Sequence, residues 1–279
     1  MNGPGPQAER PALGPILRVK PGERIHLRRL DPAATPGRTK ADAATERRAV
    51  EKRLADLQER LFAESKHAVL VVLQGIDASG KNGTIRHAMS ALDPSGVVVT
   101  GFRQPTELEH AHDFLWRVHQ HTPAKGELAI FNRSHYESVL VERVHQLVPR
   151  RVWQRRYATI NAFERLLIEE GTTIVKCFLH LSKDEQARRF QERVDDPRKR
   201  WKFRLADLVE RERWTAYEAA FEDALSRCST PWAPWYVIPA DNRWFRNLAV
   251  ATILAATLEE LHPRFPPSPD PLPPGLRVT

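Results

Sequence analysis

Apolar residues recur along the chain with two different periods, and these periods predict the elements of the fold. The segment from Ala68 to Leu73 reads AVLVVL. An unbroken apolar run rich in β-branched residues is typical of a strand buried on both faces of a parallel sheet. Four shorter runs are also predicted to be strands: Val97 to Thr100, Leu128 to Phe131, Ile174 to Leu179 and Trp235 to Ile238.

Helical patterns separate these strands. A helix over Thr45 to Glu64 is predicted from apolar residues at helical spacing, namely Val50, Leu54, Leu57 and Leu61. Further helices are predicted over Glu107 to His119, Ser134 to His145, Trp153 to Glu169, Lys183 to Val194, Leu205 to Leu225 and Trp244 to Leu261. Alternating strands and helices favour right-handed βαβ crossovers. The expected fold is therefore α/β, with a parallel sheet covered by helices on both faces.

Composition limits the setting of this fold. Of 22 prolines, seven fall between Pro4 and Pro36 and seven between Pro263 and Pro274, so we expect extended or mobile tails around one globular body. Cys177 and Cys228 are the two cysteines, and both sit in core-like segments, which excludes a disulfide framework. No apolar run has signal-peptide or membrane-spanning length, so a cytoplasmic protein without membrane association is expected. The net charge of +8 favours polyanionic partners without choosing among them.

A glycine-rich loop follows the first strand directly. It reads GIDASGK from Gly75 to Lys81 and satisfies the pattern of glycine, four residues, glycine and lysine, in the strand-loop-helix context that a phosphate-binding P-loop requires. Glycines let successive N–H groups curl around an anion, and Lys81 supplies a mobile positive charge. The residues expected to bind phosphate here are Gly75, Ala78, Ser79, Gly80, Lys81, Asn82 and Gly83.

Two residues depart from a standard P-loop. Asn82 stands where a Ser or Thr usually holds magnesium, and Asp77 places a carboxylate inside the loop. A carboxylate among phosphate-binding groups repels the ligand unless a cation lies between them, so Asp77 is predicted to be a Mg²⁺ ligand. The alternative is a chance glycine-rich turn in which Asp77 caps the helix.

A second polar cluster follows the strand that ends near Phe131. It reads NRSHYE from Asn132 to Glu137, at the carboxyl end of a strand, where α/β sheets bind ligands. Ser134 and Glu137 also form a capping-box pattern for a helix. The structural and the functional interpretation can both hold.

Taken together, four motifs in this order resemble the family-2 polyphosphate kinases, which are P-loop enzymes of thymidylate-kinase-like fold. The motifs are QGIDASGKNGT, FNRSHYE, DDPRKRWKF and PWYVIPADNRWFRN, and the resemblance runs from about Leu70 to about Leu261. It implies Mg²⁺-dependent transfer of the terminal phosphoryl group of inorganic polyphosphate to AMP or ADP, which gives ADP or ATP. It also implies a homo-oligomer.

The same resemblance assigns roles to residues. Asp77 and Lys81 would hold metal and phosphate, Arg133 would contact phosphate, and Glu137 would lie beside the metal and the acceptor nucleotide. Relatives that read Asp-Arg-Ser-Trp-Tyr-Asn differ at three positions, where this chain has Asn132, His135 and Glu137. The loss of the Asp at position 132 leaves Glu137 as the second metal carboxylate. The variant FNRSHYE resembles the subgroup that accepts both AMP and ADP.

Basic residues concentrate between Arg188 and Arg204, eight of them against three acidic residues. P-loop kinases carry a mobile lid after this strand, and its positive side chains close over the phosphates. We therefore predict a basic helical lid at about 183–213. Its expected phosphate contacts are Arg188, Arg189, Arg193 and Lys202. The alternative is a solvated helix face with ion pairs four residues apart.

The expected organisation is a proline-rich extension over 1–40, a P-loop kinase domain over 41–262 and a proline-rich tail over 263–279. Two rival functions remain. One is an ATP-dependent nucleoside or nucleotide kinase, which Asn82 disfavours because the Ser or Thr after the lysine is missing. The other is a basic, non-catalytic nucleic-acid-binding module, which Asp77 disfavours. Basic residues with Trp201 as the one aromatic among them suit a polymer without bases, so nucleic acid is not expected as a partner.

Overall fold

The computed structural model describes residues 12–270 and 276–277. Its centre is a five-stranded sheet in the order β2-β3-β1-β4-β5, with parallel pairing throughout. The strands are β1 (Ala68–Gln74), β2 (Val97–Gly101), β3 (Leu128–Asn132), β4 (Thr172–His180) and β5 (Trp235–Pro239). All five predicted strands are confirmed, each longer than predicted by one to three residues.

Strand β1 is buried along its whole length because helices cover both faces of the sheet. Successive side chains of a strand point to opposite faces. Accordingly, Val69, Val71 and Leu73 belong to one core cluster, while Leu70 and Val72 belong to the other. This explains why the strand reads as a continuous apolar run instead of an alternating one.

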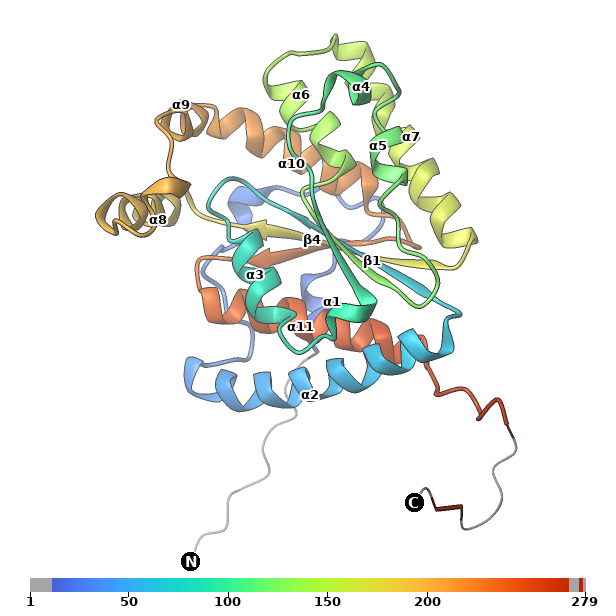
Figure 1. Ribbon diagram of the computed structural model, residues 1–279. Coiled ribbons are helices and arrows are strands. Elements are labelled where there is room, and N and C mark those ends of the chain that lie inside the picture. Colours follow the sequence, from blue (N-terminus) through green and yellow to red (C-terminus); the bar gives the residue numbers. More distant parts are fainter. Residues whose placement is uncertain (1–11, 271–275, 278–279) are drawn as a thin grey trace, which may run out of the picture.

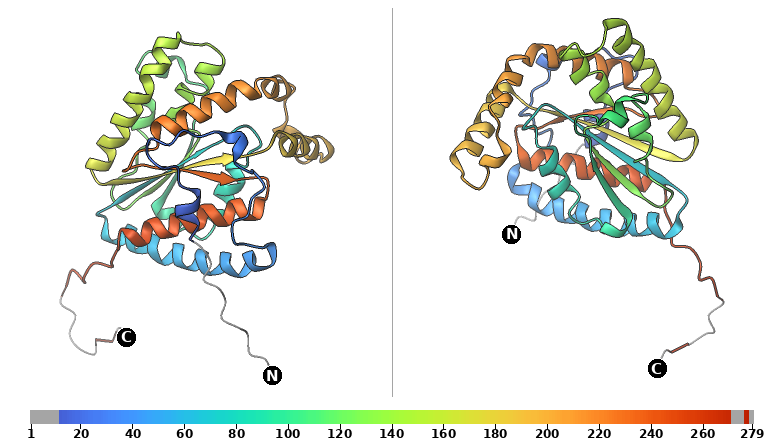
Figure 2. Two further views of the ribbon diagram at one scale, coloured as in Figure 1. Left: turned by 180° about the vertical axis from the view of Figure 1, so that it is seen from behind. Right: turned by 45° about the horizontal axis from the view of Figure 1, so that its top comes forward.

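The helices form the two outer layers of the fold. They are α1 (Leu13–Leu17), α2 (Lys40–Glu64), α3 (Lys81–Ala88), α4 (Glu107–His110), α5 (Trp116–His119), α6 (Val141–Val144), α7 (Arg150–Glu169), α8 (Lys183–Asp195), α9 (Ala206–Glu212), α10 (Trp214–Cys228) and α11 (Arg243–Glu260). Helices α1, α2 and α11 pack on one face of the sheet, and α7 and α10 pack on the other (Figure 1). Figure 2 shows the same layers from behind and from above. The predicted three-layer α/β fold is confirmed.

Three of the long predicted helices are interrupted, one of them over Ser134 to His145. The pattern over Leu205 to Leu225 divides at Arg213 into α9 and α10, where the chain tightens into a bond from the Arg213 N–H to a carbonyl three residues earlier. The pattern over Glu107 to His119 divides at Asp113, whose carboxylate accepts a hydrogen bond from the Leu115 N–H at 2.9 Å. Such local bonds compete with the helical ones.

Residues 12–40, which were expected to be extended or mobile, pack against the sheet instead. Leu17, Val19 and Leu27 are buried in the two cores. The Val19 N–H donates to the Trp235 carbonyl at 2.8 Å, which attaches this segment to the edge of β5. The expectation was wrong because the prolines alternate with apolar residues that the body of the protein can bury. The parts of the predicted tails at residues 1–11, 271–275 and 278–279 lie outside the described residues.

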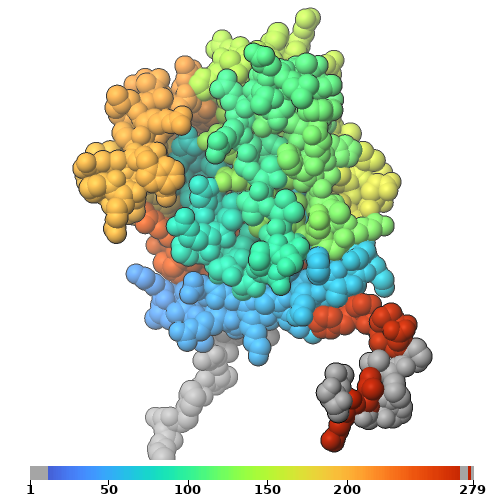
Figure 3. Space-filling model, in the orientation of Figure 1, coloured from blue at the N-terminus to red at the C-terminus, as the bar shows by residue number. Residues whose placement is uncertain are grey.

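The segment from α8 to α9, which is the predicted lid, stands at one side of the molecule in the space-filling view (Figure 3). It follows β4 and therefore begins at the carboxyl edge of the sheet. Within the described residues, no helix combines the length and the apolar character needed to cross a membrane.

Candidate active site

The loop between β1 and α3 has the backbone of a phosphate cradle. Gly75 and Gly80 have φ values of 154° and 107°, and Ala78 has a φ of 63°. A Cβ atom on Gly75 would lie 2.7 Å from Ser79 Oγ, so a larger residue does not fit there. Gly80 is the N-cap of α3 and provides no side-chain cap. The first N–H groups of α3 are therefore free of a side-chain acceptor at the cap, as an anion site requires.

Lys81 bends back over this loop. Its Nζ donates to the carbonyls of Gly75 and Ile76 at 2.6 and 3.3 Å. Burial, together with the charge of Arg133, lowers the pKa of Lys81 to about 8 despite the nearby Asp77. The ammonium group thus lies at the loop, where a phosphate chain can replace the carbonyls as its partner.

Three charged side chains from two loops meet beside Lys81. Arg133 donates to Asp77 Oδ1 at 2.6 Å and to Glu137 Oε2 at 3.4 Å. Burial alone raises the pKa of Asp77, but the charges of Lys81, Arg133 and Arg193 outweigh it and lower the pKa. Asp77 is therefore ionised at neutral pH. The four predicted catalytic residues, Asp77, Lys81, Arg133 and Glu137, lie in one cluster.

Arg133 reaches both carboxylates from a strained backbone. Its φ of 65° is unusual for a residue with a side chain, and its N–H donates to the Leu73 carbonyl at 3.0 Å. The helix predicted over Ser134 to His145 is instead a 3-10 turn at His135–Ser138 followed by the short α6. Ser134 caps that turn through the Tyr136 N–H, so the capping box with Glu137 does not form. This cap fixes the turn that presents Arg133 and Glu137.

The carboxylates of Asp77 and Glu137 fit a Mg²⁺ ion chemically. Mg²⁺ takes hard oxygen ligands and is usually held by one or two carboxylates, waters and substrate phosphates. Both carboxylates are partly exposed and reach the same guanidinium, that of Arg133. Within the described residues, no group of three or more His, Cys, Asp or Glu side chains is placed to hold a metal without such a substrate.

Asn82, which departs from a standard P-loop, contacts Asn132, which departs from the motif weighed in the resemblance. Asn132 at the end of β3 donates a hydrogen bond to Asn82 at the start of α3. Neither side chain carries charge, so neither can serve as a metal carboxylate. The bond instead links the loop after β1 to the loop after β3.

A pocket opens beside this cluster and is walled by the lid and by α10. The lining side chains beyond the loop include Arg133, Glu137, Gln186, Asp207, Glu210, Arg211, Tyr217 and Phe221. Tyr217 donates to Glu210 at 2.9 Å, and His145 lies 2.9 Å from the same carboxylate. The pocket therefore combines an aromatic wall with charged groups, but its volume of about 30 Å³ is that of a water-sized cavity and does not hold a nucleotide in this structure.

The predicted lid contacts take different positions. Arg193 is half-buried and its charge acts on Asp77, while Lys202 is exposed and its ammonium lies 4.9 Å from the Trp201 ring centroid. Arg188 is exposed and paired with Glu185 and Glu192. This arrangement matches the alternative interpretation of the basic segment, a solvated helix face with ion pairs. These three side chains remain candidates for phosphate contact.

Arg189 does not face the pocket. It is buried and donates to Glu185 and to the carbonyls of Ala78, Ser79, Ala240 and Asp241. All five of its N–H groups are thus taken by protein acceptors. No N–H of Arg189 is left for a phosphate in this structure, because the side chain turns inward from α8 and holds the loop from behind; its predicted phosphate contact stays a prediction.

Two further residues hold the loop and were missed from the sequence. Gln186 donates to the Asp77 carbonyl at 2.8 Å, and Arg246 donates to the Ser79 carbonyl at 3.2 Å. Ser79 itself is fully buried. A spacing pattern could not have found them, because Gln186 lies on α8 and Arg246 on α11, far from the loop in the sequence.

Comparison with known proteins places these features in a family. Residues 38–266 match the family described as polyphosphate kinase 2. The AMP/ADP-polyphosphate phosphotransferase of Meiothermus ruber is 56% identical over 251 residues, which cover 89% of this chain and 94% of that protein. The ADP-polyphosphate phosphotransferase of Rhodopseudomonas palustris is 45% identical over 227 residues, 77% of this chain and 78% of that protein.

A solved structure agrees with the sequence matches. The crystal structure of polyphosphate kinase 2 from Arthrobacter aurescens TC1 superposes with a TM-score of 0.90 at 43% identity, covering 94% of each chain. Fold, loop and sequence agree, and the chain belongs to the polyphosphate kinase 2 family.

Proposed function

We propose that this protein transfers the terminal phosphoryl group of inorganic polyphosphate to both AMP and ADP. The observation that carries the proposal is the cluster in which Arg133 joins the loop carboxylate Asp77 to Glu137 beside Lys81. The similarity to the Meiothermus ruber protein, named for both acceptors, supports the dual specificity. Family membership favours this function over an ATP-dependent kinase and over a nucleic-acid-binding module.

The chain's own residues supply positioning and charge. The end of the polyphosphate chain lies in the loop between Gly75 and Lys81, and the acceptor nucleotide lies beside Glu137. A terminal phosphate oxygen of the acceptor attacks the end phosphorus in line, and the bond to the shortened polyphosphate breaks. That oxygen is already ionised at neutral pH, so neither a protein nucleophile nor a general base is needed. Lys81 and Arg133 neutralise the moving charge.

Asp77 and Glu137 would hold Mg²⁺. When bound, the ion supplies positive charge to the phosphate oxygens as the phosphoryl group moves. Arg133 contacts both carboxylates in the protein alone, and its charge helps to lower the pKa of Asp77 against the effect of burial. The loop carboxylate is therefore in the charge state that a cation needs before it arrives.

The direct test is to incubate the purified chain with long-chain polyphosphate, Mg²⁺ and either AMP or ADP, without ATP. We expect ADP and ATP to form from AMP, and ATP to form from ADP. A folded sample that gives no product with either acceptor would rule out the proposed function. Product from ADP alone would rule out only the dual specificity.

The metal assignment has its own test. We expect Asp77→Asn to lower turnover by about 100-fold or more, because a metal contributes several kcal/mol to stabilising the transferring group. The matched control is Asp56→Asn, which changes an exposed carboxylate on α2 that pairs with Arg60. Undiminished turnover in the Asp77 variant would contradict its role.

The proposal also includes a homo-oligomer, and the predicted domain boundaries at 40 and 262 stay predictions. Sedimentation equilibrium would test the first, since it measures the mass of the assembly directly. Limited proteolysis would test the boundaries.

A further inference from the structure

The guanidinium group of Arg246 is buried behind the phosphate loop, and no carboxylate in the described part of the chain pairs with it. Arg246 lies near the start of α11 and is 3% exposed. Its Nη1 donates to the Ser79 carbonyl at 3.2 Å, and its Nε and Nη2 donate to the side-chain oxygen of Asn247 at 3.1 and 2.8 Å. Among the described residues, Arg246 forms no ion pair. Its charge is therefore buried and uncompensated.

Two glycines let this charge lie against the loop. A Cβ atom on Gly80 would lie 1.8 Å from Arg246 Nη1, and one on Gly83 would lie 3.0 Å from Nη2. The guanidinium therefore packs directly on the backbone of the loop and of the first turn of α3. Any larger residue at Gly80 would push the charge away from the cradle.

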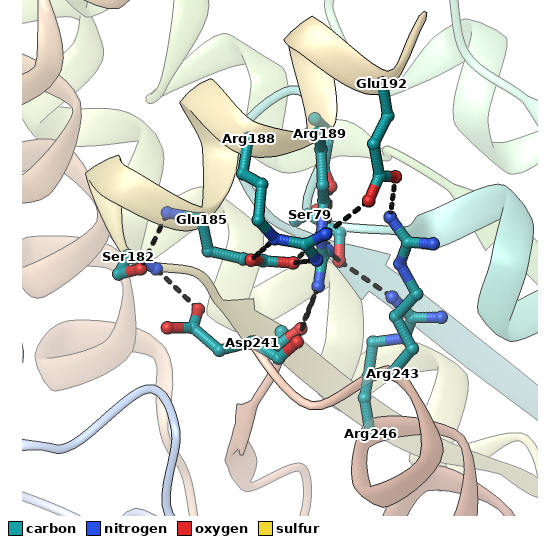
Figure 4. A network of polar contacts seen from close by, with 11 residues as sticks. Ser79, Ser182, Glu185, Arg188, Arg189, Glu192, Asp241, Arg243 and Arg246 are labelled. Atoms are coloured by element: carbon teal, nitrogen blue, oxygen red, sulfur yellow. Dashed lines mark hydrogen bonds and ion pairs between the residues drawn. The ribbon is translucent and has the colours of Figure 1, made fainter. Parts of the chain in front are cut away.

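A second buried arginine reaches the same carbonyl from another element. Arg189 of α8 donates to the Ser79 oxygen at 3.0 Å, so guanidinium groups from α8 and α11 converge on one atom (Figure 4). Burial, followed by the charges of Arg189 and Arg243, lowers the pKa of Arg246 to about 9. The carboxylate Glu185 pairs with Arg189, and Glu192 pairs with Arg243. Neither reaches Arg246.

This arrangement is unfavourable in the protein alone. A buried charge without a partner costs free energy, and a cation near a helix N-terminus opposes the helix dipole. The same charge becomes favourable when an anion lies on the other side of the loop, where little water separates the two. The bond to the Ser79 carbonyl also holds that oxygen away from the cradle, so that the loop N–H groups can face it.

We infer that Arg246 is a positioning residue for the phosphate donor: it supplies a positive charge that the bound polyphosphate compensates, and it fixes the orientation of the Ser79 peptide. The inference rests on the proposed function, since it requires polyphosphate in the loop. Arg246 does not touch the ligand. It acts through the backbone of Ser79 and Gly80.

The test compares Arg246→Gln with Arg246→Lys, by the thermal midpoint without ligand and by the Kd for tripolyphosphate. We expect Arg246→Gln to melt no lower than the wild type, because an uncompensated charge is removed. Its Kd should rise by about tenfold or more. Arg246→Lys keeps the charge and should bind within about threefold of the wild type.

Arg243→Gln is the matched control, since it removes the same charge from the same helix at a position that Glu192 compensates. An equal change in Kd for the two Gln variants would overturn the inference, because net charge alone would then explain binding. A lower midpoint with unchanged Kd in Arg246→Gln would show a structural role and overturn it too. If both quantities change, Arg246→Lys decides: weak binding by that variant excludes charge as the cause.

The wild type separates this inference from the proposed function. Wild-type protein that does not bind tripolyphosphate would overturn both. Wild-type protein that binds it, while Arg246→Gln binds it equally well, would overturn only the role of Arg246.

Discussion

Two of the places where the protein buries charge differ in how that charge is balanced. On the face of the sheet covered by α7 and α10, Lys176 Nζ lies 2.5 Å from Glu164, and both side chains are fully buried. The ammonium also donates to the Tyr136 hydroxyl at 3.0 Å and to the Cys228 carbonyl at 2.7 Å. All three of its donors are used. On the other face, Arg246 has no counterion among the described residues.

The balanced cluster serves the fold, whereas the unbalanced charge lies behind the loop in which we propose that polyphosphate binds. Burial alone raises the pKa of Glu164, but Lys176 and His135 outweigh it and lower the pKa, so Glu164 is ionised beside its partner. Tyr136 and His135, which contact Glu164, belong to the turn that presents Arg133 and Glu137. On our proposal, bound polyphosphate supplies the counter-charge that Arg246 lacks, so a buried charge needs a partner within the chain only where no ligand supplies one.

The largest effect should come from breaking the balanced cluster. We expect Lys176→Met to lower the free energy of unfolding by about 3–5 kcal/mol, because Glu164 would remain buried without a partner. Urea denaturation measures this change. The double variant Lys176→Met, Glu164→Leu should recover part of it, since it removes both charges. A single variant as stable as the wild type would contradict the comparison.

The next largest effect is expected on phosphate binding, through the protonation of Lys81 in the loop. Its pKa is lowered to about 8 in the free protein, and a bound phosphate chain raises it by supplying negative charge. Binding therefore takes up a proton above pH 8. We expect the affinity for tripolyphosphate to be steady below that pH and to weaken by about tenfold per pH unit above it.

The measurement is the Kd for tripolyphosphate between about pH 7 and pH 9.5, a span chosen around this pKa. Lys81→Gln serves as the control, because its pH dependence keeps the ionisation of the ligand and of the other groups, including Arg246, and lacks only that of Lys81. A wild-type profile parallel to that of Lys81→Gln would contradict the role of Lys81.

The smallest effect is expected at the exposed, paired arginine of α8. Arg188 contacts Glu185 and Glu192 on the surface, where ion pairs contribute little. Arg188→Gln should change the free energy of unfolding by less than about 0.5 kcal/mol. A decrease in the free energy of unfolding as large as that of Lys176→Met would show that exposed and buried ion pairs do not differ in their contribution to stability.

Sequence patterns predicted the sheet well and the helix breaks poorly. β1, β3 and β4 were found because they are buried on both faces, which leaves a long apolar run, whereas β2 and β5 were found from shorter β-branched or aromatic runs. The breaks at Asp113 and Arg213 were missed because single local hydrogen bonds decide them. The packed segment before α2 was missed because its few apolar residues are scattered among prolines.

The site was predictable only where its residues are consecutive. Asp77 and Lys81 share one loop, and Arg133 and Glu137 share one turn, so the motifs contained their geometry. The support from behind the loop was not predictable, because Arg189 and Arg246 come from α8 and α11 and converge only through the tertiary fold. Arg189 was expected to face the ligand because it belongs to a basic helix. The sequence of such a helix does not show which of its arginines point toward the ligand and which point into the protein.

The segment before α2 also completes one border of the sheet. Arg18 forms an antiparallel bridge with Tyr236, next to the bond between Val19 and Trp235. Without this segment, β5 would present unpaired N–H and C=O groups, which are a template for aggregation between chains. Pro21 lacks an N–H group and so cannot extend the pairing. A chain trimmed beyond Val19 would therefore expose an unpaired strand edge that can pair with other chains. Its solubility should decrease before its catalytic activity does.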